Sequence, residues 1–221
     1  MGVSKVRDEA EITFELQLMR DIMHYPRTEN LTGDKAIDRL MAGNRRYVTA
    51  KQIHPNQMPE RRAELIDGQR PFAVILGCAD SRVPPEIIFD QGLGDLFVVR
   101  VAGNVVSEVV MESIEYAATH LHTPLVMVLG HSQCGAITAT VASDKSEENQ
   151  STLYTILRPS VDKARRRPGN LVNNAAKINA KMASRNLERN GSVFSDLVNT
   201  HKLKIVAAYY HLETGVVEIL S

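Results

Sequence analysis

The chain has 221 residues, a length that suits one α/β domain with additional elements. Its 26 lysines and arginines equal its 26 aspartates and glutamates, so its net charge gives no general attraction for nucleic acid or an anionic membrane. No apolar run approaches the ~20 residues that cross a bilayer, and residues 1–30 lack the hydrophobic stretch of a secretory signal. Two cysteines are too few for a disulfide framework. The sequence therefore predicts a cytoplasmic protein with no nucleic-acid or membrane partner.

The N-terminal segment has a helical pattern, because apolar residues recur at steps of three and four: Ile12, Leu16, Met19 and Met23. We expect residues 1–33 to form a helical arm that lies on the main body or on a partner subunit. Residues 34–221 are then expected to form a single α/β domain. Asp34 is predicted to cap a helix that runs toward Tyr47.

Four short apolar runs predict strands: residues 72–77, 96–100, 125–130 and 203–210. Their continuous apolar character is typical of strands covered on both faces, as in a parallel sheet. Helical patterns lie between them, at residues 106–121, 133–141 and 161–190, the last broken at Pro168-Gly169. A last hairpin is predicted to join residues 207–211 to residues 216–219. The alternation indicates an α/β fold with a central, mainly parallel β-sheet flanked by helices.

Two of the strand runs end in residues that bind metals. Cys78 follows the first run, and His131 follows the third, with Cys134 three residues later. Because ligands collect at the carboxyl ends of parallel strands, we expect these side chains to meet. Two sulfurs and one imidazole suit Zn²⁺, and three protein ligands leave a fourth position open, as in catalytic sites. Cys134 is expected in the first turn of a helix, whose dipole favours the thiolate.

Simpler interpretations of these residues stay open on spacing alone. A free cysteine is often merely buried, and a histidine after a glycine can simply satisfy a backbone carbonyl. Asp80 and Arg82 taken alone predict a helix cap and a surface ion pair. Beside a metal, Asp80 could accept a hydrogen bond from zinc-bound water or bind the zinc itself, while Arg82 orients the carboxylate.

A basic cluster precedes Pro168 and consists of Lys163, Arg165, Arg166 and Arg167. It is predicted to be a solvated helix end, and an anion-binding site is the alternative.

The two metal-binding motifs together resemble a known family. Cys-x-Asp-Ser-Arg at residues 78–82, followed by His-x-x-Cys-Gly at residues 131–135, resembles the β-class carbonic anhydrases. Residues 39–44 are similar to the family's early helix. Residues 97–104 are similar to its second strand and the loop that follows, and residues 113–117 to the helix before the histidine. The resemblance covers residues 35–142.

The resemblance implies one Zn²⁺ per chain, bound by Cys78, His131 and Cys134. It also implies that Asp80 and Arg82 form a catalytic dyad. The activity that it implies is the reversible hydration of CO2 to bicarbonate and a proton. Asp80 is a possible fourth zinc ligand in a closed state, which we expect falling pH to favour because hydroxide competes with the carboxylate for the metal.

The resemblance further implies a substrate pocket formed by Gln69, Phe97 and Tyr116, as in the plant-like branch of the family. Without it, these would be a loop residue and two core aromatics. The family also implies a homodimer or a larger assembly in which a neighbouring subunit completes the pocket. Two alternatives are a carbon disulfide or carbonyl sulfide hydrolase on the same scaffold, and a non-catalytic zinc-binding assembly protein.

Overall fold

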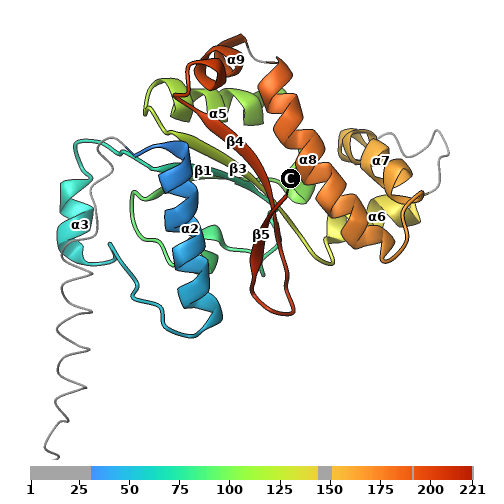
Figure 1. The fold of residues 1–221 in the computed structure, drawn as a ribbon, viewed down its shortest axis with the longest axis horizontal. Coiled ribbons are helices and arrows are strands. Elements are labelled where there is room, and N and C mark those ends of the chain that lie inside the picture. The colour runs from blue at the N-terminus through green and yellow to red at the C-terminus, as the bar shows by residue number, and fades with distance from the viewer. Residues whose placement is uncertain (1–30, 144–150, 191, 221) are drawn as a thin grey trace, which may run out of the picture.

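The computed structural model describes residues 31–143, 151–190 and 192–220. The N-terminal arm predicted for residues 1–33 therefore lies almost entirely outside the described residues, and the arm and its boundary stay predictions. The described chain is organised by one five-stranded sheet in the order β2-β1-β3-β4-β5 (Figure 1).

Four strands of the sheet are parallel: β1 (Ala73–Gly77), β2 (Leu96–Arg100), β3 (Leu125–His131) and β4 (Lys204–Tyr210). The last strand, β5 (Val217–Leu220), pairs antiparallel with β4 and forms the predicted hairpin. In the centre, Val74 of β1 lies opposite Phe97 of β2 and Val126 of β3. The predicted α/β class with a mainly parallel sheet is confirmed.

The helices of the first half are α2 (Gly33–Val48), α3 (Pro59–Glu64), α4 (Pro85–Ile88), the short 3-10 helix η1 (Ala102–Asn104) and α5 (Glu108–Thr119). Those of the second half are α6 (Gly135–Ala142), α7 (Thr152–Ala164), α8 (Leu171–Asn190) and α9 (Ser192–Asn199). The break predicted at Pro168-Gly169 separates α7 from α8. The predicted cap at Asp34 is wrong: the Thr32 side chain accepts a hydrogen bond from the Lys35 N–H, and Asp34 lies in the first turn.

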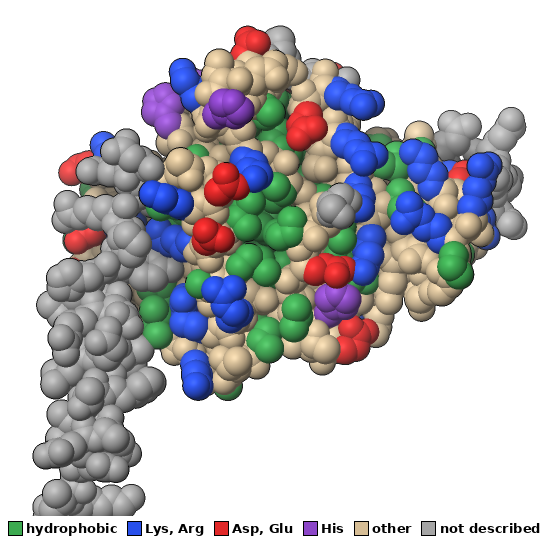
Figure 2. All heavy atoms as spheres, in the orientation of Figure 1, with side chains coloured by type: hydrophobic (Ala, Val, Ile, Leu, Met, Phe, Trp, Pro, Cys, Tyr) green, Lys and Arg blue, Asp and Glu red, His purple; other side chains and the backbone are tan. Residues whose placement is uncertain are grey.

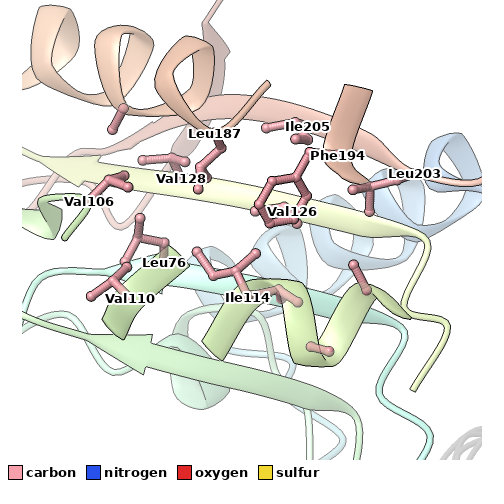
Figure 3. Packing of buried hydrophobic residues seen from close by; sticks show 14 of the residues in the cluster. Leu76, Val106, Val110, Ile114, Val126, Val128, Leu187, Phe194, Leu203 and Ile205 are labelled. Carbon is pink, nitrogen blue, oxygen red and sulfur yellow. The ribbon is translucent and has the colours of Figure 1, made fainter. Parts of the chain in front are cut away.

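Helices cover both faces of the sheet. Alternate residues of each strand point to opposite faces, so every central strand packs against helices on two sides. On one face, Ile75 and Met127 pack with Leu40 of α2. On the other, Val126 and its neighbours pack against α5, α8 and α9, with Ile114 among the buried residues (Figure 3). Since the central strands are buried on both sides, their continuous apolar sequence follows directly from the fold.

A third apolar cluster lies where α6, α7 and α8 meet the sheet. It contains Cys78 and Cys134 together with Ile137 and Leu157. The two cysteines thus lie in a buried and mostly apolar part of the molecule, at the carboxyl ends of the strands. Across residues 31–143, 151–190 and 192–220, no helix has the length and apolar character needed to cross a membrane.

Candidate metal centre

Three side chains that are separated in sequence meet at the carboxyl edge of the sheet. Cys78 follows β1, His131 is the last residue of β3, and Cys134 immediately precedes α6. One ligand atom from each lies within 4.8 Å of the other two, and all three residues are buried. Among the described residues this is the one group of three or more histidine, cysteine or carboxylate side chains placed to hold a metal. Parallel pairing of β1 with β3 brings the two motifs together.

The imidazole of His131 is oriented with one nitrogen toward this centre. Its Nδ1 lies 2.8 Å from the carbonyl oxygen of Ser132, so Nδ1–H donates there and the lone pair remains on Nε2. The side chain is completely buried, and Nε2 has no hydrogen-bond partner in the described part of the chain. A buried polar atom without a partner is unfavourable, so this nitrogen fits a bound cation.

The two cysteines affect each other's ionisation. Hydrogen bonding from the Cys134 thiol lowers the pKa of Cys78 to about 4, and the same contact, together with burial, raises the pKa of Cys134. The backbone N–H of Gly103 also donates to the Cys78 sulfur, at 3.3 Å. Cys134 is the N-cap of α6, one residue before the first turn in which we expected it. A cation bound by both sulfurs takes the place of their shared proton, as metal binding to thiols requires.

Asp80 and Arg82 form a bidentate pair beside the centre. The Nε and Nη2 atoms of Arg82 donate to the two carboxylate oxygens of Asp80 at 2.9 and 2.7 Å. These bonds lower the pKa of Asp80 to about 2. Asp80 Oδ2 lies 3.9 Å from His131 Nε2. Arg82 also donates to the carbonyl oxygen of Gln133 at 3.3 Å, which connects the two metal-binding loops.

Sequence reasoning missed three residues that support the centre. Arg100, at the end of β2, donates to the carbonyl oxygens of Cys78 and Asp80 and so fixes the loop between them. Asn179 of α8 is buried and donates to the carbonyl oxygen of Gly103 at 2.8 Å. Gly103 has a φ of 66°, which suits glycine and turns its N–H toward Cys78. An arginine that closes an apolar strand is a sequence signal for Arg100, whereas nothing local marks Asn179.

The predicted pocket residues lie away from the metal centre of their own chain. Phe97 and Tyr116 contact each other, with ring centroids 6.3 Å apart, and the Tyr116 side chain is half exposed. Gln69 is exposed in the loop before β1, in a hollow that Leu93 also lines. Because Gln69 and Phe97 lie toward the amino ends of β1 and β2, and Cys78 lies beyond the carboxyl end of β1, one chain does not bring them together.

Known proteins share this sequence pattern and this fold. The family model described as carbonic anhydrase matches residues 73–217, which include both metal-binding motifs. The fold is similar to that of a tetrameric β-carbonic anhydrase from Sordaria macrospora, with a TM-score of 0.66 and 23% sequence identity over 74% of this chain and 87% of that one. The chain belongs to the β-class carbonic anhydrases.

Bacterial relatives within the family agree with this assignment. The carbonic anhydrase of Mycolicibacterium smegmatis is 42% identical over 188 residues, which are 82% of this chain and 90% of the relative. Carbonic anhydrase 2 of Mycobacterium tuberculosis is 54% identical over 118 residues, which are 53% of this chain and 56% of the relative. The chain is thus an enzyme of the carbonic anhydrase type. Its placement in the plant-like branch stays a prediction.

Proposed function

We propose that the chain hydrates CO2 reversibly to bicarbonate and a proton, with one Zn²⁺ held by Cys78, His131 and Cys134. The observation that supports this most is the convergence of two sulfurs and an unpartnered imidazole nitrogen within 4.8 Å. Two thiolates and one imidazole suit zinc with a fourth position left open. Zinc in such a site supplies a Lewis acid that lowers the pKa of water toward neutrality.

The dyad acts on the reacting water. In hydration the water oxygen bonds to the carbon of CO2, the electron pair of one C=O π bond moves onto its oxygen, and the water gives one proton to the solvent. Asp80 Oδ2, 3.9 Å from His131 Nε2, is positioned to accept a hydrogen bond from this water and so direct an oxygen lone pair at CO2. Arg82 keeps the carboxylate charged and in place. In the closed arrangement that we also propose, Asp80 would leave Arg82 and bind the metal itself, in the place that water would otherwise take.

The substrate pocket requires a second copy of the chain in this proposal. Gln69, Phe97 and Tyr116 lie on the β2 side of the sheet, and β2 is an edge strand. Val109 and Tyr116, both on α5, are 71% and 47% exposed, so this helix presents apolar surface that a neighbouring copy could cover. A homodimer that places this edge against a neighbour's metal centre completes both sites. The tetrameric relative from Sordaria macrospora supports such self-association.

Neither cysteine forms a disulfide, and metal binding requires that both stay reduced. Because the cytoplasm keeps thiols reduced, we propose a cytoplasmic location. Cell fractionation would test it.

Metal analysis combined with a hydration assay tests the reaction. The proposal expects one zinc per chain and CO2 hydration whose rate scales with zinc content. Hydrolysis of carbon disulfide without CO2 hydration would show that the same centre serves the other substrate. A stoichiometric zinc content without either activity would favour the non-catalytic assembly protein.

A mixed-subunit experiment tests the shared pocket. Gln69→Ala removes a pocket residue, and Cys134→Ser removes a metal ligand, so each homo-oligomer is expected to be impaired. If the pocket is shared, a mixed dimer combines the intact metal centre of the first variant with the intact pocket of the second and regains one working site. If every pocket belonged to its own chain, mixing would restore nothing.

A further inference from the structure

A row of cations runs along α8. Its members are Lys177, Lys181, Arg185 and Arg189, spaced by four residues and therefore on one side of the helix. Like charges at this spacing repel each other and oppose helix formation. Lys177 forms an ion pair with Glu218, which lies on β5. A negatively charged group beside the row would relieve this repulsion.

The middle of this row borders a hollow between α8 and the end of α7. The hollow has a volume of about 270 Å³, and two of its lining residues, Ile178 and Met182, are apolar. The other five are cations: Lys163, Arg166, Arg167, Lys181 and Arg185. Figure 2 shows lysine and arginine side chains gathered over the surface that α7 and α8 form. None of the residues that line the hollow is acidic.

A solvated helix end explains only part of this arrangement. Cations in the last turn of a helix are favoured by the partial negative charge of its final carbonyl groups. This accounts for Lys163 and its neighbours after α7, which ends at Ala164. Lys181 and Arg185 lie within α8, which continues to Asn190, so the same effect does not reach Lys181.

The side chains that line the hollow include five basic residues and no acidic one. Asp162, the acidic residue next to Lys163 in sequence, lies 4.0 Å from Arg165, whose side chain is not part of the lining. Lys163 Nζ lies 3.6 Å from the thioether sulfur of Met182, a weak acceptor. Because the whole chain carries as many acidic as basic residues, this is a concentrated local charge and not a general property of the surface.

We propose that the hollow binds a small anion that carries two or more phosphoryl groups. Arginine and lysine recognise phosphate oxygens by charge-assisted hydrogen bonds, and arginine does so with a two-pronged geometry. Five basic side chains around one hollow offer more charge-assisted donors than a single phosphate group can use. The volume of about 270 Å³ lies below the range usual for drug-sized ligands, so it fits a compact polyphosphate and not a long polymer.

Calorimetric titration of the full-length, zinc-loaded protein with tripolyphosphate tests this inference. The expected result is one site per chain, with an affinity at least about tenfold higher than for orthophosphate, since additional charge-assisted contacts form. The Lys181→Gln/Arg185→Gln/Arg166→Gln variant is expected to lose about tenfold or more of the tripolyphosphate affinity. All three side chains lie at the surface or are partly exposed, and CO2 hydration reports that the variant is folded.

The matched control removes three cations elsewhere, in Arg45→Gln/Lys51→Gln/Lys202→Gln, and so changes the net charge equally. The proposal requires that this control binds tripolyphosphate like the unmodified chain. Equal losses in both triple variants would overturn it, because net charge alone would then explain binding. No detectable tripolyphosphate binding would also overturn it, including when vesicles with phosphorylated lipids or an RNA oligonucleotide do bind. Binding to such vesicles in addition to tripolyphosphate would support the site and identify a lipid headgroup as a second source of the ligand.

Discussion

Asn179 offers a way to change the metal centre without touching a metal ligand. Its Nδ2 donates to the carbonyl oxygen of Gly103 at 2.8 Å, and the N–H of Gly103 donates to the Cys78 sulfur at 3.3 Å. Replacing Asn179 with alanine leaves the buried carbonyl of Gly103 without this donor. The peptide is then free to turn, and Cys78 loses a fixed hydrogen bond.

Two effects of Asn179→Ala have predictable sizes. Leaving a buried acceptor unpaired costs ~1–3 kcal/mol of unfolding free energy. Loss of support behind a metal ligand lowers metal affinity ~10–100-fold, which corresponds to ~1.4–2.7 kcal/mol of binding free energy. The first effect is measured by urea unfolding, and the second by competition between the protein and a zinc chelator of known affinity.

The matched control is Asn174→Ala on the same helix. Asn174 also donates to a carbonyl oxygen, that of Pro168, at 2.9 Å, but this bond is exposed and has no connection to Cys78. We expect a change within ~0.5 kcal/mol in unfolding free energy and no change in zinc affinity. If Asn179→Ala were destabilised but kept the zinc affinity of the unmodified chain, Asn179 would support only the fold, and the reasoning about the metal centre would fail.

Four further predictions concern the metal ligands, the Asp80–Arg82 pair, the packing at Gly43 and the oligomeric state. Cys134→Ser is expected to lose most zinc and all activity, and stoichiometric zinc after gel filtration would show that the ligand set is wrong. Arg82→Lys removes the two-pronged bond to Asp80, so we expect most CO2 hydration to be lost in stopped-flow assays while zinc is retained; simultaneous zinc loss would indicate a structural role instead. Gly43→Ala would place a Cβ 1.7 Å from the carbonyl oxygen of Phe89, so urea unfolding should show a loss of at least ~1–3 kcal/mol, and an unchanged midpoint would refute the close approach. Light scattering at micromolar concentration should show a dimer or larger, and a stable monomer would contradict the shared pocket.

The positions of the metal-binding residues could be predicted because they depend on strand ends. The apolar runs before Cys78 and His131 are long enough only for buried strands, and parallel pairing then places both residues at one edge. The α/β class follows from the same alternation of strands and helices. The apolar runs, together with the rule that ligands collect at the carboxyl ends of parallel strands, were sufficient to predict the positions of these residues.

The details of the centre depend on contacts that spacing does not encode. The hydrogen bond that Cys78 receives from the N–H of Gly103 depends on a backbone turn that motif spacing does not reveal. Arg100 and Asn179 reach the site from β2 and α8, so their roles appear only once the chain is folded. At the start of α2, Thr32 and Asp34 are both good capping residues, and the choice was made by the backbone conformation.

The pocket residues show a different limit. Gln69 precedes β1 and Phe97 lies near the start of β2, whereas Cys78 follows the end of β1. The fold of a single chain therefore does not bring them beside its metal centre. If a neighbouring subunit supplies them, the missing information is the symmetry of the assembly and not the local structure.

We propose that zinc at Cys78, His131 and Cys134 gives this chain its carbonic anhydrase activity. Stopped-flow CO2 hydration tests this most directly, on protein preparations whose zinc content has been measured and varied. We expect saturable hydration, with a rate that rises in proportion to zinc up to one ion per chain. Protein that carries one zinc per chain at this centre and does not hydrate CO2 would contradict it.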